Sequence, residues 1–176
     1  MNLFLIGYRA SGKTTVAPEL AARLGMALID ADAEIAQRAG KRIAAIFAED
    51  GEPAFRDLET AVVKDLAARD GWIVALGGGA VMREENRRAL AGRGKTVWLR
   101  ASIETIQARL LAYPSTAATR PSLTSRGLAE EVAQILSVRA PVYEACADAI
   151  VDVEGKSPPA IAEEIIALLN LPPPAR

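Results

Sequence analysis

Short apolar runs alternate with segments of helical periodicity along most of this chain. Five runs predict buried β-strands, because each is short and rich in aliphatic residues: Leu3–Ile6, Ala27–Ile29, Trp72–Leu76, Thr96–Leu99 and Ala149–Val151. Apolar residues that recur every three or four positions predict helices between these strands. Short buried strands separated by helices are typical of a parallel sheet covered on both faces, so the pattern predicts an α/β fold.

The predicted helices differ in length and in how they end. The first covers residues 14–24, and residues 31–69 are expected to be mostly helical, with breaks near Gly40 and at 51–53. Further helices are predicted at 83–90, at 102–111, at 128–145 and at the end of the chain, where Ile161, Ile165, Leu168 and Leu169 form an apolar stripe. We expect residues 1–170 to form one domain and residues 171–176, which contain three prolines, to form a loose tail.

Residues 7–14 have the sequence GYRASGKT, which matches the pattern G-x-x-x-x-G-K-[ST] of loops that wrap the phosphates of a nucleoside triphosphate. The match lies between the first predicted strand and the first predicted helix, which is the order that such a loop requires. Backbone N–H groups and the helix N-terminus would then face the phosphates. We expect Lys13 to reach the β- and γ-phosphates and Thr14 to bind Mg²⁺. The alternative is an ordinary turn between a strand and a helix.

Composition excludes several classes of protein. The chain has 176 residues, 51% of them hydrophobic, and a net charge of −1, so we expect neither a disordered chain nor a binder of nucleic acid. Histidine is absent, which leaves acid and base chemistry to carboxylates. Cys146 is the only cysteine, and we expect it to be a core residue of a cytoplasmic protein. No apolar run approaches the roughly 20 residues of a membrane span, no signal peptide is evident, and we expect a monomer.

Polar residues and glycines follow the predicted strands, where parallel sheets bind their ligands. Asp30 and Asp32 come after the second strand, and they suit a Mg²⁺ ion and a substrate hydroxyl. The alternative for this pair is a helix N-cap. Residues 77–79 are three glycines after the third strand, which allow a backbone to approach a ligand closely, although a flexible turn would also use them.

Two arginines and one long connection are further candidates. Arg56 could bind a carboxylate through two nitrogens, but an exposed ion pair with Glu59 is the simpler interpretation from sequence. The same two interpretations hold for Arg139. Residues 112–126 form a polar, proline-containing connection, and connections of this length are often lids. Arg120 in its middle could contact the transferring phosphoryl group, the alternative being a passive connector.

Taken in order, these motifs resemble those of the shikimate kinases, over nearly the whole chain. The resemblance rests on the phosphate loop, the triple glycine and four further features: Asp30-Ala31-Asp32, Phe55-Arg56 with Glu59, Arg120-Pro121, and Arg139 with Tyr143. Of these features, only the phosphate loop is specific individually. The full set in this order is highly specific. The resemblance implies a three-layer P-loop NTPase fold like that of nucleoside-monophosphate kinases, with a five-stranded parallel sheet in the order 2-3-1-4-5. It also implies transfer of the γ-phosphoryl group of ATP to the 3-hydroxyl of shikimate, a step towards aromatic amino acids.

The same resemblance implies roles for individual residues. Those expected to bind ATP are Ala10, Ser11, Gly12, Lys13, Thr14, Thr15, Arg109, Arg120 and Pro158, with Arg109 and Pro158 near the adenine. Mg²⁺ is expected on Thr14 and Asp30. Shikimate is expected on Asp32, Arg56, Gly78, Gly79 and Arg139, with both arginines on its carboxylate. The implied catalytic residues are Lys13, Asp32 as the candidate base, and Arg120.

The chain departs from the common pattern at two places. Arg9 adds a charge within the phosphate loop, and the connection at 112–126 is long, which resembles a longer-lid subgroup.

One alternative function is that of a gluconate-kinase-like or other small-metabolite kinase. Another is a nucleotide-switch protein, although the guanine-reading Asn-Lys-x-Asp motif is absent from the sequence. A nucleic-acid-acting ATPase would need a basic stripe and aromatic stacking platforms, whereas aromatic residues make up only 5% of this chain.

Overall fold

The computed structural model describes residues 1–112 and 127–172 of the chain. Within these residues, one sheet of five parallel strands has the order β2-β3-β1-β4-β5. The strands are β1 (Asn2–Ile6), β2 (Ala27–Asp30), β3 (Trp72–Ala75), β4 (Gly94–Arg100) and β5 (Ala149–Asp152). The predicted α/β fold and strand order are confirmed. Because β1 is the central strand, the loop that follows it emerges in the middle of the sheet.

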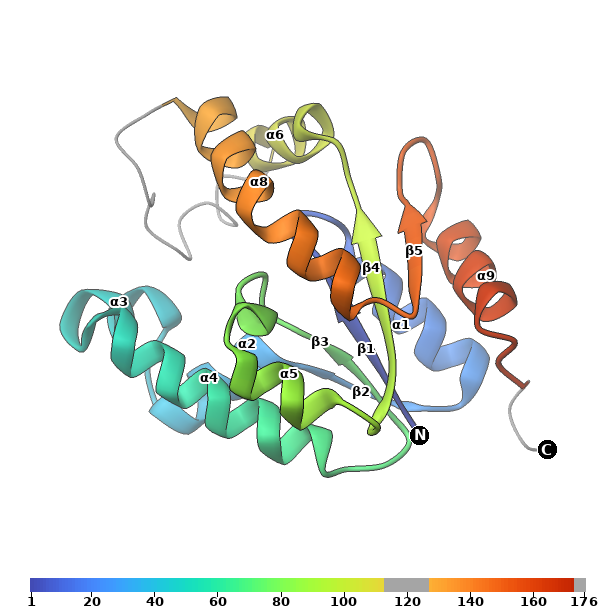
Figure 1. The fold of residues 1–176 in the computed structure, drawn as a ribbon, viewed down its shortest axis with the longest axis horizontal. Helices are drawn as coiled ribbons and strands as arrows, with labels where there is room; N and C mark the ends of the chain where they lie inside the picture. Colours follow the sequence, from blue (N-terminus) through green and yellow to red (C-terminus); the bar gives the residue numbers. More distant parts are fainter. Residues whose placement is uncertain (113–126, 173–176) are drawn as a thin grey trace.

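Helices cover both faces of the sheet (Figure 1). Helices α1 (Lys13–Leu24) and α9 (Pro158–Leu168) lie together on one face. Helices α4 (Gly51–Ala67), α5 (Glu84–Leu90) and α8 (Leu128–Cys146) lie on the other. The alternation of side chains along β1 fits this arrangement, since Leu3 and Leu5 pack on the α1 side, and Phe4 and Ile6 pack on the α4 side.

The remaining helices are short and lie around the carboxyl end of the sheet (Figure 1). They are α2 (Ala31–Ala39), α3 (Ile43–Glu49), α6 (Ile103–Ala112) and the 3₁₀-helix η1 (Ala80–Met82). The predicted helical stretch at 31–69 is therefore three helices. Gly40, with a φ of 65°, ends α2 in the left-handed conformation that favours glycine, and the second break lies at Asp50.

Several predicted details differ from the structure. Leu168 is not part of the apolar stripe, since it is 52% exposed. The helix ends at this residue, and Leu169 and Leu171 pack against the core instead. The sequence pattern also missed η1, which is too short for a period to be visible. No helix among the described residues is both long and apolar enough to cross a membrane. The domain and tail boundaries at residue 170 stay predictions.

Candidate active site

The phosphate loop, residues 7–14, connects β1 to α1 through backbone conformations that most residues avoid. Gly7, Ala10 and Gly12 all have positive φ angles, of 141°, 61° and 104°. A Cβ atom on Gly7 would lie 2.6 Å from the carbonyl oxygen of Leu99, so the loop has no room for another residue there. Lys13 folds back over the loop, where its Nζ donates to the carbonyl oxygens of Gly7 at 2.8 Å and Tyr8 at 2.9 Å.

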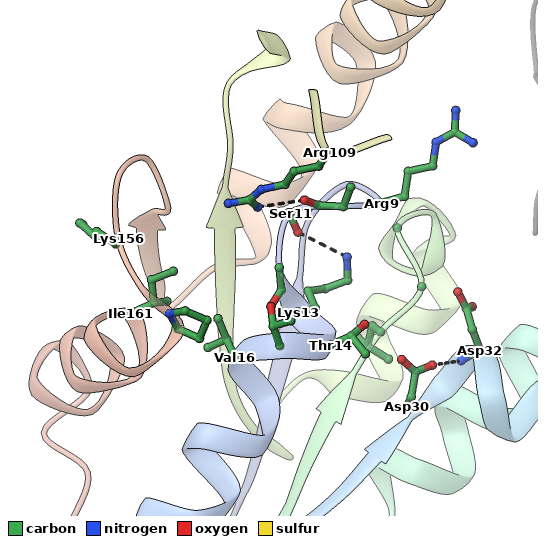
Figure 2. A pocket seen from close by; sticks show the side chains of 17 residues that line it. Arg9, Ser11, Lys13, Thr14, Val16, Asp30, Asp32, Arg109, Lys156 and Ile161 are labelled. Atoms are coloured by element: carbon green, nitrogen blue, oxygen red, sulfur yellow. Dashed lines mark hydrogen bonds between the residues drawn. The ribbon is translucent and has the colours of Figure 1, made fainter. Parts of the chain in front are cut away.

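A cavity of about 470 Å³ lies over this loop, at the carboxyl ends of β1, β2 and β3 (Figure 2). It brings together most of the residues that sequence reasoning assigned to ATP and Mg²⁺. Those lining it include Ala10, Ser11, Gly12, Lys13, Thr14, Thr15, Asp30, Asp32, Gly78, Arg109 and Pro158. A cavity with backbone N–H groups and a helix N-terminus at its floor suits a nucleoside triphosphate.

Asp30 both caps a helix and faces the cavity, so the two interpretations from sequence are compatible. Its Oδ1 accepts from the backbone N–H groups of Asp32 at 2.9 Å and Ala33 at 3.1 Å, which caps α2. Burial raises the pKa of the Asp30 carboxyl above its ordinary value, against the opposing effect of the hydrogen bond from Ala33. Asp32 lies in the first turn of α2 and also lines the cavity.

The residues at this place fit a magnesium ion that is held jointly with phosphate. Figure 2 shows Thr14 at the start of α1 beside the carboxylates of Asp30 and Asp32. Within the described part of the chain, no cluster of three histidine, cysteine, aspartate or glutamate side chains could form a metal cage. Mg²⁺ does not need such a cage, since it is usually held by one or two carboxylates, waters and substrate phosphates. A cation there would also offset the unfavourable burial of the Asp30 carboxylate.

Arg56 is held beside the triple glycine by two carboxylates of its own helix. Its Nη1 lies 2.7 Å from Oε2 of Glu59, and its Nη2 lies 3.1 Å from Oε1 of Glu52. The expectation of an exposed pair is wrong, because the side chain of Glu59 is only 1% exposed and that of Arg56 only 14%. Burial acts to lower the pKa of Arg56, but Glu59 more than offsets it and the net shift is upward, so the guanidinium stays charged. A Cβ atom on Gly79 would lie 2.7 Å from Nη1 of Arg56, so only glycine leaves room for this guanidinium.

Arg139 and Tyr143, both on α8, meet the neighbouring glycine. The Tyr143 hydroxyl donates to the carbonyl oxygen of Gly78, and this tyrosine is fully buried. A Cβ atom on Gly78 would lie 3.5 Å from Nη1 of Arg139 and 3.4 Å from the backbone N of Arg9. The space beside Gly78 is therefore bounded by both the phosphate loop and Arg139 of α8. The two arginines from distant helices converge on adjacent glycines, of which Gly78 lines the cavity over the phosphate loop, whereas Gly79, Arg56 and Arg139 lie outside its lining.

Three basic side chains at the cavity had weak or no signals in the sequence. Arg109 from α6 donates to the carbonyl oxygen of Ala10 at 3.0 Å, so it crosses the phosphate loop (Figure 2). Lys156 lines the cavity near Pro158 and pairs with Glu164 at 2.6 Å. Sequence reasoning missed Lys156, and its place two residues before the start of α9 was the one available signal. Arg9 also lines the cavity.

Comparison with known proteins shows which family this chain belongs to. The sequence model described as "Shikimate kinase" matches residues 9–170, which is most of the chain. The chain belongs to the shikimate kinase family. A shikimate kinase of Nitratidesulfovibrio vulgaris is 48% identical over 169 residues, which are 96% of this chain and 95% of that protein. A shikimate kinase of Rhodopirellula baltica is 41% identical, over 94% of this chain and 88% of that protein.

A solved shikimate kinase also shares the fold. The structure of the Acinetobacter baumannii enzyme, described as a complex with shikimate, aligns with a TM-score of 0.90 at 32% identity. The alignment covers 96% of this chain and 92% of that one. The predicted resemblance to the shikimate kinases and the predicted three-layer fold are confirmed.

Two predictions within the shikimate kinase framework need separate comment. Arg120 and nearly all of the predicted lid at 112–126 lie outside the described residues, so their roles stay predictions. Cys146 is only partly buried at the edge of the core, where burial raises the pKa of its thiol. The prediction that it is a core residue is therefore correct only in part.

Proposed function

We propose that the described cavity is the active site at which this shikimate kinase transfers the γ-phosphoryl group of ATP to the 3-hydroxyl of shikimate. The products are shikimate 3-phosphate and ADP, as in a step of aromatic amino acid biosynthesis. The observation that carries the proposal is the contact of Gly78 with both the phosphate loop and Arg139. It brings a site for a phosphate donor and a site for a carboxylate-bearing acceptor side by side.

On the donor side, the phosphate loop binds ATP through its backbone N–H groups and the N-terminus of α1. Residues 10–15 contribute, and Lys13 leaves the carbonyl oxygens of Gly7 and Tyr8 to neutralise charge on the β- and γ-phosphates. Thr14 and Asp30 would hold Mg²⁺, which would neutralise charge on the phosphates. Arg109 and Pro158 contact the nucleotide, and Arg120 contacts the transferring phosphoryl group.

On the acceptor side, the carboxylate and the reacting hydroxyl of shikimate each have a matching residue. Arg56 and Arg139 bind the carboxylate, because a guanidinium presents two parallel N–H donors to it. Gly78 and Gly79 allow the ring to approach the backbone closely. Asp32 accepts a hydrogen bond from the reacting hydroxyl and is the candidate base. Because the transition state of phosphoryl transfer is loose, much of the effect of Asp32 is to orient this hydroxyl.

The wider setting is also a proposal. We infer that residues 1–170 act as one kinase domain, that residues 112–126 serve as its lid, and that the enzyme is a cytoplasmic monomer. It has no nucleic-acid or membrane partner. The composition supports this view, with a net charge of −1 and a single cysteine.

A coupled assay for ADP release tests the acceptor. The enzyme with MgATP is offered shikimate, gluconate or no acceptor. We expect rapid release with shikimate alone. Faster turnover of gluconate would assign the chain to another small-metabolite kinase, because gluconate also carries a carboxylate that the two arginines would bind. Equal release without an acceptor would favour a nucleotide-hydrolysing switch. Omitting Mg²⁺ in the presence of a chelator should abolish turnover.

A further inference from the structure

Two side chains of the phosphate loop, Tyr8 and Arg9, lie against the helices α6 and α8. We propose that Glu131 on α8 is a positioning residue for the acceptor. With Arg9 it fixes the rotation and height of α8 against the phosphate loop, and it thereby sets the position of Arg139 at Gly78. The proposal rests on the role given above to Arg139 in binding the shikimate carboxylate.

The first observation is a buried ion pair between the loop and the helix. Nη2 of Arg9 lies 3.3 Å from Oε1 of Glu131, and the two side chains are 18% and 2% exposed. Glu131 is in the first turn of α8, where a carboxylate also interacts favourably with the helix dipole. A carboxylate this deeply buried is costly unless a cation compensates it, so the pair resists any motion that would separate α8 from the loop.

The second observation is an apolar contact beside the ion pair. Tyr8 is 3% exposed and belongs to a small core with Ile106 and Leu110 of α6 and Val132 of α8. Two guanidinium groups also lie over its ring, with Cζ of Arg9 5.7 Å and Cζ of Arg139 5.8 Å from the ring centroid. Tyr8 therefore contacts both the anchored end of α8 and the arginine that faces Gly78.

The third observation is how α8 connects these places. Val132, Arg139 and Tyr143 are spaced by seven and four residues, so they lie on one face of the helix. Glu131 precedes Arg139 by two helical turns, and α8 runs unbroken through both, although Pro141 lacks the N–H that would bond to the carbonyl oxygen of Ser137 in the turn that contains Arg139. A helical segment of two turns is stiff, so a rotation at Glu131 would reach Arg139. Releasing the ion pair should thus move Arg139 away from Gly78 without removing any group from the site.

The test compares four variants by calorimetric titration of shikimate and of ATP, well below the unfolding temperature of each variant. The variants are Glu131→Gln, Arg139→Ala, the double variant, and the control Glu130→Gln. Glu130 is exposed and lies in the same first turn, so its replacement removes the same charge near the helix N-terminus without touching the buried pair. We expect Glu131→Gln to weaken shikimate binding by about 3- to 30-fold. ATP affinity should change by less than about twofold, as should both affinities in the control.

The double variant separates positioning from general stability. If Glu131 acts through Arg139, then Glu131→Gln should have almost no further effect on shikimate affinity once Arg139 is alanine. Additive losses, an unchanged shikimate affinity in Glu131→Gln, or an equal loss of ATP affinity would each overturn the positioning role. If Arg139→Ala alone leaves shikimate affinity unchanged, the assignment of Arg139 to the carboxylate fails first, and the positioning role fails with it. Should Glu131→Gln be too unstable to purify, Glu131→Asp keeps the charge, shortens the side chain by one methylene and should show a smaller loss in the same cycle.

Discussion

The two halves of the active site are built in different ways. Most of the proposed donor half lies within residues 7–14, where consecutive backbone groups and one helix N-terminus line the cavity, and Asp30, Arg109 and Pro158 join it from other elements. The acceptor half is assembled from α2, α4, the triple glycine and α8, which are far apart in sequence. Its key side chains are held by other side chains, as Arg56 is by Glu52 and Glu59. The donor half is thus largely a local structure, whereas the acceptor half exists only when the chain has folded.

This contrast predicts how each half responds to substitution. A change in the donor half should affect the nucleotide and the rate directly, because its groups contact phosphate oxygens. A change in the acceptor half should spread to neighbouring residues, because its groups hold one another in place. Non-additive effects are therefore expected mainly on the acceptor side.

The largest effect is expected from Lys13→Met, which keeps part of the apolar stem and removes the charge. Turnover should fall by on the order of 10²–10³-fold, because the charge that develops on the phosphate oxygens loses a preorganised partner. Thermal unfolding should change less than turnover, since the lysine donates to part-buried carbonyl oxygens of the phosphate loop and not to the hydrophobic core. Turnover and unfolding are measured on the same preparation. Near-normal turnover at saturating ATP would remove Lys13 from the donor half.

Asp32→Asn should lower turnover by on the order of 10²-fold and leave ATP affinity nearly unchanged. The amide still reaches the hydroxyl, but it cannot accept the proton and aligns the hydroxyl less strongly. Steady-state kinetics with both substrates varied would separate the two effects. A loss confined to ATP affinity would instead place Asp32 on the metal side and exchange its role with that of Asp30.

Arg56→Lys tests the shared carboxylate. Lysine keeps the charge but loses the planar pair of donors, so shikimate affinity should fall by about 10- to 150-fold, with ATP affinity spared. Arg139→Lys should have an effect of similar size. The proposed sharing of one carboxylate by both arginines predicts that the double variant loses less than the sum of the two single losses. Strict additivity of the two losses in the titrations would contradict a shared carboxylate. It would leave the kinase assignment standing.

Gly79→Ala should act on the acceptor half without changing any charge. The new methyl would lie 2.7 Å from Nη1 of Arg56, and the flexible guanidinium would move aside. Shikimate affinity should therefore fall by about 10-fold. The unfolding temperature should also fall, because the buried Glu59 carboxylate loses part of its contact with Arg56. Gly127→Ala is the matched control, since a Cβ atom there would meet nothing within 4 Å. Equal shikimate affinity in the two variants would show that the position of Arg56 does not depend on Gly79.

The smallest effect concerns stability at the metal side. Because the pKa of Asp30 is raised in the folded protein, its ionised carboxylate is less favourable there than in the unfolded chain. This loss of folding stability is present at neutral pH. It disappears as the pH falls through the pKa of Asp30 in the folded protein and then below its pKa in the unfolded chain. Asp30→Asn, which still caps α2, should therefore raise the unfolding temperature of the metal-free protein at pH 7. The gain in unfolding temperature should vanish in acid. In a separate assay, Mg²⁺-dependent turnover should fall. An equal gain in unfolding temperature at pH 7 and in acid would point to a cause other than ionisation of Asp30.

Sequence patterns predicted the phosphate loop between a strand and a helix, because its signal is local. The spacing of Gly7, Gly12, Lys13 and Thr14 carries the whole motif, and the adjoining strand and helix have clear periods. The same patterns could not show that Glu59 is buried under Arg56, or that Glu131 pairs with Arg9. An ion pair over 122 residues leaves no local signal, and a glutamate next to an arginine on a helix looks the same whether it is exposed or buried.

The contact between Gly78 and the phosphate loop sets a limit on how the enzyme can evolve. The two loops leave neighbouring strands that pair in register, with Leu5 opposite Ala75, so the backbones of the two loops start one strand spacing of about 4.8 Å apart. The sheet therefore keeps the triple glycine next to the phosphate loop. Substitutions of the two arginines can change how an acceptor is bound and oriented, but they leave this spacing between the loops unchanged.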